Sequence, residues 1–131
     1  MPDSIFTKII NGEIPCHKVY EDENTFAFLD IHPVQPGMVL VVTKRPAEDF
    51  IQLTDDELHT LMDAVKKIAQ RLKQVFPAKK RIGVMLEGLD VAHTHVKVFP
   101  IDSGDEFRTS PDMDAEPDHA ALAAMAKRLA F

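Results

Sequence analysis

Two histidines and a lysine occupy alternate positions in one short segment, residues 91–100. Apolar and β-branched residues separate His93, His95 and Lys97. This alternation is typical of a half-buried β-strand, in which successive side chains point to opposite faces. The two imidazoles and the ammonium group are therefore expected on one face of the strand. The other face then carries Ala92, Thr94, Val96 and Val98.

Three interpretations of this face remain open from the residues alone. A solvent-exposed strand can carry such side chains for solubility only. A His-x-His pair can also hold a metal ion, with His17, His32 or an acidic residue completing the site, although Lys97 would repel the cation. The third interpretation is a nucleotide-phosphate site in which one histidine acts as a nucleophile. We favour the third, because all three side chains suit an anionic ligand.

Length and charge exclude several classes of protein. The chain has 131 residues, enough for one domain with a substantial core. Its net charge of −6 argues against nonspecific binding to nucleic acid or to an anionic membrane. No apolar run approaches the ~20 residues of a membrane span. The single cysteine, Cys16, and the absence of a secretory-signal pattern predict a cytoplasmic protein.

Apolar periodicity predicts an α+β fold with a mainly antiparallel sheet. Strands are expected over residues 17–21, 25–30, 38–43, 81–87 and 91–100. Asp3 is the expected cap of a short helix that runs to Ile10. A long helix follows the capping box Thr54–Glu57 and ends near Pro77. Its buried stripe is expected to consist of Leu58, Leu61, Met62, Val65, Ile68, Leu72 and Val75.

The last thirty residues differ in character from the rest. Residues 102–118 are acidic and rich in Ser, Pro and Asp, which favours an exposed loop or arm, with a lid over the site as the alternative. Pro117 is expected in the first turn of a final helix that carries Leu122, Met125 and Leu129. We therefore expect one domain over residues 1–101, with the arm and helix of residues 102–131 packed on it.

A series of short motifs runs through the first hundred residues. They are Ile5-Phe6, Lys8-Ile9-Ile10, Glu13-Ile14-Pro15, Val19-Tyr20-Glu21-Asp22, Ala27-Phe28-Leu29-Asp30-Ile31, Pro33, Pro36-Gly37 and His93-x-His95. In this order they resemble the histidine-triad (HIT) family, and especially its Hint-like branch. The resemblance covers roughly residues 4–100 and implies the HIT-like α+β fold, with one long helix and a C-terminal helix.

The resemblance also implies a function. Members bind a purine nucleotide or nucleotide conjugate and act at its α-phosphate as hydrolases or transferases, on phosphoramidates or dinucleoside polyphosphates. They are usually homodimers whose two sheets join, and no cofactor or metal is expected here. By position, the base pocket is expected to consist of Phe6, Ile9, Ile14, Phe28 and Ile31, with Asp30 accepting the ribose hydroxyls. Plain core packing explains each of these apolar residues equally well.

The catalytic motif of the family is His-φ-His-φ-His, in which the middle histidine attacks phosphorus. That position is His95 here, and His93 is the orienting first member. The implied mechanism is a covalent nucleotidyl-His95 intermediate that water then hydrolyses. Main-chain amides and cationic groups would neutralise charge on the phosphoryl oxygens.

The sequence departs from the family pattern at several places in the site. Lys97 replaces the third histidine; it keeps a positive charge, but an ordinary lysine is a poor proton donor near pH 7. Met38 follows Pro36-Gly37 where relatives often carry another histidine. Asp90 replaces a hydroxyl that donates to phosphate, and the loop before Gly88 is shorter and lacks the usual Asn-x-Gly. These changes keep a second hypothesis open: a nucleotide-binding or sensing module with impaired catalysis.

One further difference lies near the N-terminus. Some bacterial relatives carry Cys-x-x-Cys where this chain has Ser4 and Thr7, and bind a structural zinc there. Neither Ser nor Thr supplies a thiolate, so no zinc is expected at this end.

Overall fold

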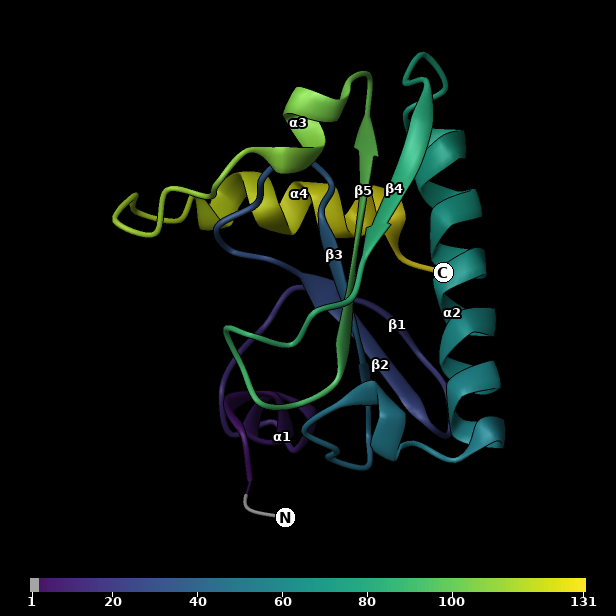
Figure 1. Cartoon of the computed structure of the whole chain (residues 1–131). Helices are drawn as coiled ribbons and strands as arrows, with labels where there is room; N and C mark the ends of the chain where they lie inside the picture. The colour runs from purple at the N-terminus through teal and green to yellow at the C-terminus, as the bar shows by residue number, and fades with distance from the viewer. Residues whose placement is uncertain (1–2) are drawn as a thin grey trace.

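The computed structural model describes residues 3–131 and has a five-stranded sheet at its centre (Figure 1). The strands are β1 (Lys18–Glu21), β2 (Thr25–Leu29), β3 (Val39–Thr43), β4 (Arg81–Met85) and β5 (His95–Ile101). They lie in the order β1-β2-β3-β5-β4, and every neighbouring pair is antiparallel. The predicted α+β class is confirmed, and each strand is shorter than the sequence suggested.

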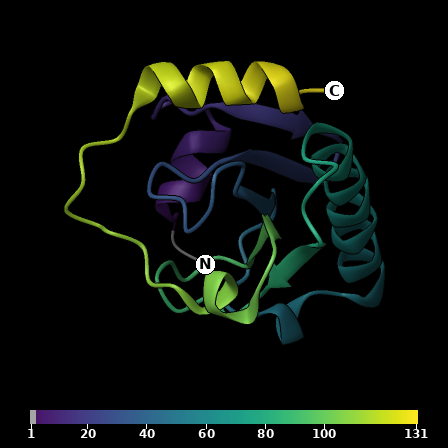
Figure 2. The same cartoon turned by 90° about the horizontal axis from the view of Figure 1, so that it is seen from above.

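Helices surround this sheet. They are α1 (Ile5–Ile10), the 3-10 helix η1 (Phe50–Gln52), α2 (Asp55–Val75), α3 (Gly104–Arg108) and α4 (His119–Leu129). Figure 2 shows α1 and α2 on opposite sides of the sheet. Among residues 3–131, no helix combines the length and the apolar character needed to cross a membrane.

Two of the predicted helix starts are wrong by one or two residues. Ser4, not Asp3, caps α1, since its hydroxyl accepts the amides of Phe6 and Thr7. Asp118 caps α4, since its carboxylate accepts the amide of Ala121, and Pro117 lies before the cap instead of in the first turn. In both cases the true cap has a side-chain oxygen in reach of the first-turn amides, which is what a helix start requires.

The two sheet faces bury separate apolar clusters. Val96 and Val98 of β5 belong to the cluster beneath α2. Leu40 of β3 and Phe99 belong to the cluster beneath α1. Because Lys97 pairs directly with Leu40 across β3 and β5, it shares the α1 side of the sheet. The alternation read from the sequence therefore assigns these faces correctly.

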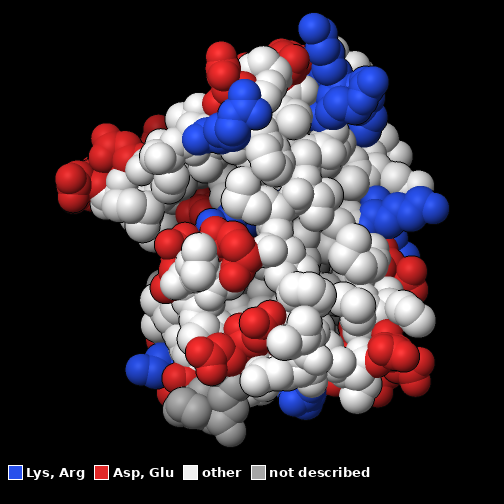
Figure 3. Space-filling view, in the orientation of Figure 1, with Lys and Arg blue, Asp and Glu red and all other residues white. Residues whose placement is uncertain are grey.

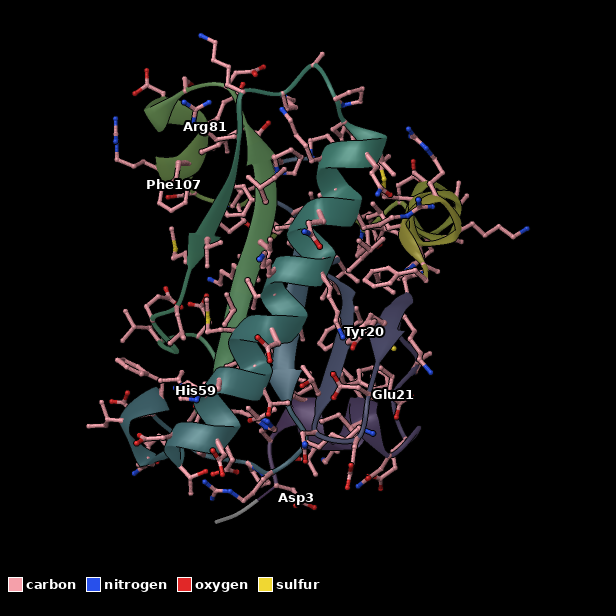
Figure 4. The ribbon with its side chains drawn as sticks, turned by 90° about the vertical axis from the view of Figure 1, so that its right-hand side faces the viewer. Asp3, Tyr20, Glu21, His59, Arg81 and Phe107 are labelled. Carbon is pink, nitrogen blue, oxygen red and sulfur yellow. The ribbon has the colours of Figure 1, made fainter. Side chains whose placement is uncertain are left out.

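The long helix α2 supplies most of the cover on its side. Leu61, Val65, Ile68 and Leu72 are buried as predicted, and the capping box of Thr54 and Glu57 is formed. Met62 is exposed over 42 % of its surface, because it lies at the margin of the apolar stripe, and Leu58 and Val75 are only partly buried. Figure 4 views the molecule from this side, with α2 in front of the sheet and Tyr20 beside α4.

The segment after β5 is only partly irregular. The short helix α3 interrupts the expected arm, and its Phe107 stacks on Phe99 with ring centroids 5.4 Å apart (labelled in Figure 4). Residues 109–118 then follow the outside of the molecule to α4 (Figure 2). Helix α4 docks through Ala126 and Leu129, which join the cluster beneath α2.

Candidate functional site

His93 lies just before β5 and is completely buried, with both ring nitrogens hydrogen-bonded. Its Nε2 is 2.7 Å from the carbonyl oxygen of Thr43, and its Nδ1 is 2.7 Å from the hydroxyl of Ser4. A carbonyl only accepts, so Nε2 must carry the proton and Nδ1 of the neutral ring accepts from Ser4. Burial lowers the pKa of His93, and the charge of His95 lowers it further, against the opposing effect of the Thr43 carbonyl. The ring is therefore held neutral in one tautomer.

His95 is oriented by the backbone of His93. Its Nδ1 is 2.7 Å from the carbonyl oxygen of His93, so Nδ1 carries the proton. The neutral ring then has its lone pair on Nε2, the atom that would act as a nucleophile. The ring is 2 % exposed and meets the edge of Phe6, with centroids 4.9 Å apart. This packing fixes the plane of the imidazole and shields it from water.

Lys97 is paired with acidic groups rather than free. Its ammonium nitrogen lies 3.2 Å from a carboxylate oxygen of Asp90 and 3.5 Å from one of Glu87. The Lys97 side chain is 15 % exposed, whereas that of Asp90 is 75 % exposed. Ion pairs with such an exposed partner contribute only about 0–1 kcal/mol. An incoming phosphate can therefore compete with these carboxylates for the ammonium group.

Asp30 follows β2 and is half-buried. Its Oδ1 accepts the backbone amide of His32 at 2.8 Å, which leaves the other oxygen available. Desolvation raises the pKa of its carboxyl above the ordinary value, although the His32 amide and the positive charges of Lys97 and His95 act in the opposite direction. A desolvated carboxylate with a free oxygen is a suitable acceptor for sugar hydroxyl groups.

A cavity of about 330 Å³ opens between the loop after β2 and the C-terminal part of the chain. Its apolar lining includes Leu29, Ile31, Met38, Leu122 and Met125. Its polar lining consists of Asp30, His32, Asp112, Glu116 and Asp118. Figure 3 shows a recess on one face of the molecule with acidic side chains around it and basic atoms deep within, whereas, among the described residues, the lining of the cavity itself contains no Lys or Arg.

The HIT domain family model matches residues 11–104. This chain belongs to the HIT family. A HIT-like protein of Methanocaldococcus jannaschii is 43 % identical over 104 residues, which is 77 % of this chain and 81 % of that protein. The crystal structure of a HIT-like protein from Bartonella henselae superimposes with a TM-score of 0.81 at 31 % identity, covering 97 % of this chain and 94 % of that one.

A relative named as an enzyme also matches part of this HIT protein. The adenosine 5′-monophosphoramidase of Candida albicans is 41 % identical over 69 residues, which is 53 % of this chain and 45 % of that enzyme. The match therefore covers about half of each chain.

The predicted site residues of the HIT protein fall into two groups. His93, His95 and Phe6 are in ring contact, with the Phe6 and His93 centroids 5.7 Å apart. Phe6, Ile9 and Phe28 are buried in the cluster beneath α1, and Ile14 packs against it. Asp30 and Ile31 instead line the cavity, and Ile31 is 40 % exposed. The apolar residues expected to form one base pocket are thus divided between core and cavity.

Two contributors to the site are not indicated by the sequence. Ser4 stands out there only as a poor zinc ligand, although Ser before a helix start is a known cap signal. Thr43 acts through its backbone carbonyl, which no residue type reveals. Residues 102–118 are expected as an exposed acidic arm or, alternatively, a lid over the site; Asp112, Glu116 and Asp118 of this segment form one wall of the cavity. Within residues 3–131, no three His, Cys, Asp or Glu side chains are grouped so as to hold a metal ion.

Proposed function

We propose that this HIT protein binds a purine nucleotide conjugate and transfers its nucleotidyl group to water through a covalent His95 intermediate. The observation that supports this most is the hydrogen bond from His95 Nδ1 to the His93 carbonyl. It leaves the Nε2 lone pair free, which is the state that a phosphorus nucleophile needs.

The reaction proceeds in two displacements. First, the Nε2 lone pair attacks the α-phosphorus, the bond from phosphorus to the leaving group breaks, and the leaving group takes that electron pair and a proton from solvent. Water then attacks the same phosphorus and releases a proton to solvent, the electron pair of the N–P bond returns to Nε2, and the nucleoside monophosphate leaves with His95 neutral again. Because the proton stays on His95 Nδ1 and is donated to the His93 carbonyl, positive charge on the phosphorylated ring is stabilised throughout.

The relatives and the cavity support the proposed substrate class. The matching part of the Candida enzyme, an adenosine 5′-monophosphoramidase, supports a nucleoside phosphoramidate. Dinucleoside polyphosphates present the same α-phosphate and belong to the same proposal. We propose that Asp30 accepts the ribose hydroxyls and that apolar side chains around Ile31 contact the base.

Lys97 is proposed as the electrostatic clamp on the phosphoryl oxygens. Its charge lies on the same side of the sheet as His95, two residues along β5. In the free protein the ammonium group of Lys97 forms ion pairs with Asp90 and Glu87. Binding of the phosphate then requires an exchange of carboxylate for phosphate, which costs little because Asp90 is largely exposed.

The test compares turnover of an adenosine 5′-phosphoramidate by the wild type, His95→Ala and His59→Ala. His59 is exposed on α2, across the sheet from α1, and serves as the matched histidine control (Figure 4). We expect kcat to fall at least about a thousandfold in His95→Ala and to be unchanged in His59→Ala. Equal rates for all three proteins would contradict the proposal.

The second candidate is a nucleotide-binding module without turnover, and one observation favours it. Lys97, at the third triad position, is neutralised by two carboxylates rather than free to assist a leaving group. Tight binding of the nucleotide by the wild type, with no conversion of substrate to product, would support this candidate.

We also propose a cytoplasmic homodimer, as the family resemblance implies. The outer strands β1 and β4 each leave one edge of the sheet unpaired within the described chain, which offers two surfaces for joining sheets. A molar mass near twice that of the chain in light scattering would support the dimer.

A further inference from the structure

We propose that Ser4 is a positioning residue for the nucleophile: its hydroxyl fixes the tautomer of His93, whose carbonyl in turn holds His95. This inference rests on the proposed nucleotidyl transfer. Ser4 is 89 residues away from His93 in sequence, and the two side chains meet at 2.7 Å. The cap of the first helix thus becomes part of the catalytic arrangement.

The hydrogen-bond pattern around Ser4 leaves one direction for its proton. The hydroxyl oxygen accepts the amide of Phe6 at 3.1 Å and that of Thr7 at 3.2 Å. A hydroxyl has two acceptor lone pairs and one donor proton. With both lone pairs engaged by amides, the proton points to the short contact, His93 Nδ1. The Thr7 hydroxyl is the other neighbour, at a longer 3.5 Å, and it already accepts the Ser4 amide.

The opposite edge of the His93 ring, at Nε2, determines which nitrogen carries the proton. The carbonyl of Thr43 requires a proton on Nε2, so Nδ1 must accept, and Ser4 is the donor that the ring meets. His93 has no exposed surface, so water cannot replace a lost donor. A buried acceptor left unpaired is costly, and the ring would turn to find a partner. Because His93 is completely buried, its ring can shift only with the rest of the residue, including the carbonyl that holds His95 Nδ1.

The same residue links the nucleophile to the apolar cluster beneath α1. Ser4 caps α1, and the second residue of this helix, Phe6, contacts the rings of both His93 and His95. A change at Ser4 therefore acts on the imidazoles through a hydrogen bond and through the position of the Phe6 ring. A variant that preserves the cap but alters the hydrogen bond is needed to separate these effects.

Three substitutions provide that separation. Ser4→Thr keeps the cap and the hydroxyl donor. Ser4→Asp keeps the cap, because Asp is as good an N-cap as Ser, but presents only acceptor oxygens to His93 Nδ1. Ser4→Ala removes both. In Ser4→Asp the His93 ring must donate from both nitrogens, so it becomes an imidazolium beside His95.

The tautomer and charge of His93 are read from ring ¹⁵N chemical shifts during a pH titration, and kcat is measured on the same samples. We expect wild type and Ser4→Thr to keep a neutral His93 with the proton on Nε2 at pH 7, and to have similar kcat. In Ser4→Asp, His93 should hold two protons at pH 7 while thermal stability stays close to that of the wild type. Its kcat should fall about 10- to 100-fold, as for other residues that orient a site ligand.

A His93 ring that is unchanged in Ser4→Asp would overturn the inference, as would a kcat equal to that of Ser4→Thr. The NMR measurement needs no substrate. A wild type without turnover would therefore contradict the proposed function, while the tautomer data would still decide the role of Ser4 at His93.

Discussion

Proton positions on two histidines determine what the site can do. Both rings contact a carbonyl oxygen at 2.7 Å, but through different nitrogens: Nε2 of His93 and Nδ1 of His95. The result is one imidazole with both nitrogens occupied and one with a free lone pair. In the proposed mechanism the nucleophile is therefore His95, and His93 orients it through its backbone carbonyl.

The pair between Lys97 and Asp90 gives a prediction about phosphate binding. Asp90→Asn removes a competing carboxylate, so the Kd for a nucleoside monophosphate should fall about two- to fivefold, the range expected for an exposed ion pair. Isothermal titration calorimetry at low ionic strength measures the change. The matched control is Asp63→Asn, an exposed acid on α2, which should leave Kd unaltered. A Kd that is equal in the two variants would mean that Asp90 does not compete with the ligand.

Among the elements, the start of α2 and the facing of β5 followed from the sequence, although β5 begins at His95, four residues later than predicted. The alternation about Val96 and Val98 assigned them to the face that packs beneath α2, and the capping box of Thr54 and Glu57 located the start of α2. These features depend on residues close together in the chain. The hydrogen bond of Ser4 to His93 spans 89 residues and depends on where α1 lies against β5, so no local pattern reveals it.

The cavity could not be predicted for the same reason. Its walls are the loop after β2 and α4, which meet only when the chain after β5 has returned across the molecule. The ionic contacts of Lys97 with Glu87 and Asp90 depend likewise on the path of the loop between β4 and β5. The resemblance to the HIT family indicated the candidate residues. It did not indicate which of them line the cavity and which belong to the core.

Helix α4 should contribute to stability through Leu129, which is 1 % exposed. Leu129→Ala should lower the free energy of unfolding by about 2–5 kcal/mol, because it leaves a cavity in the cluster beneath α2. Ala124→Ser, at an exposed position of the same helix, should change it by less than about 0.5 kcal/mol. Urea unfolding of both variants measures the difference. Similar stabilities would show that α4 is not docked as described.

For the molecule as a whole, the net negative charge opposes binding of the proposed anionic ligand. The chain carries a net charge of −6, and acidic residues of the arm line the cavity, yet the proposed ligand is an anion. We propose that only the uncharged nucleoside part of the ligand occupies the acidic, largely apolar cavity. The phosphate then lies toward Lys97 and His95, away from the acidic residues of the arm. Nucleotides should therefore bind by their neutral part and by one localized cation, not through a broad basic surface.

The most direct measurement is a rapid acid-free quench of the wild-type protein during turnover of an adenosine 5′-phosphoramidate, followed by peptide mass spectrometry. Phosphorus attached to imidazole nitrogen is acid-labile, so the quench must be alkaline or denaturant-based. We predict an adenosine monophosphate adduct on His95, present during steady state and absent from His95→Ala. Turnover without any adduct on His95, or an adduct on another residue, would contradict nucleotidyl transfer through His95.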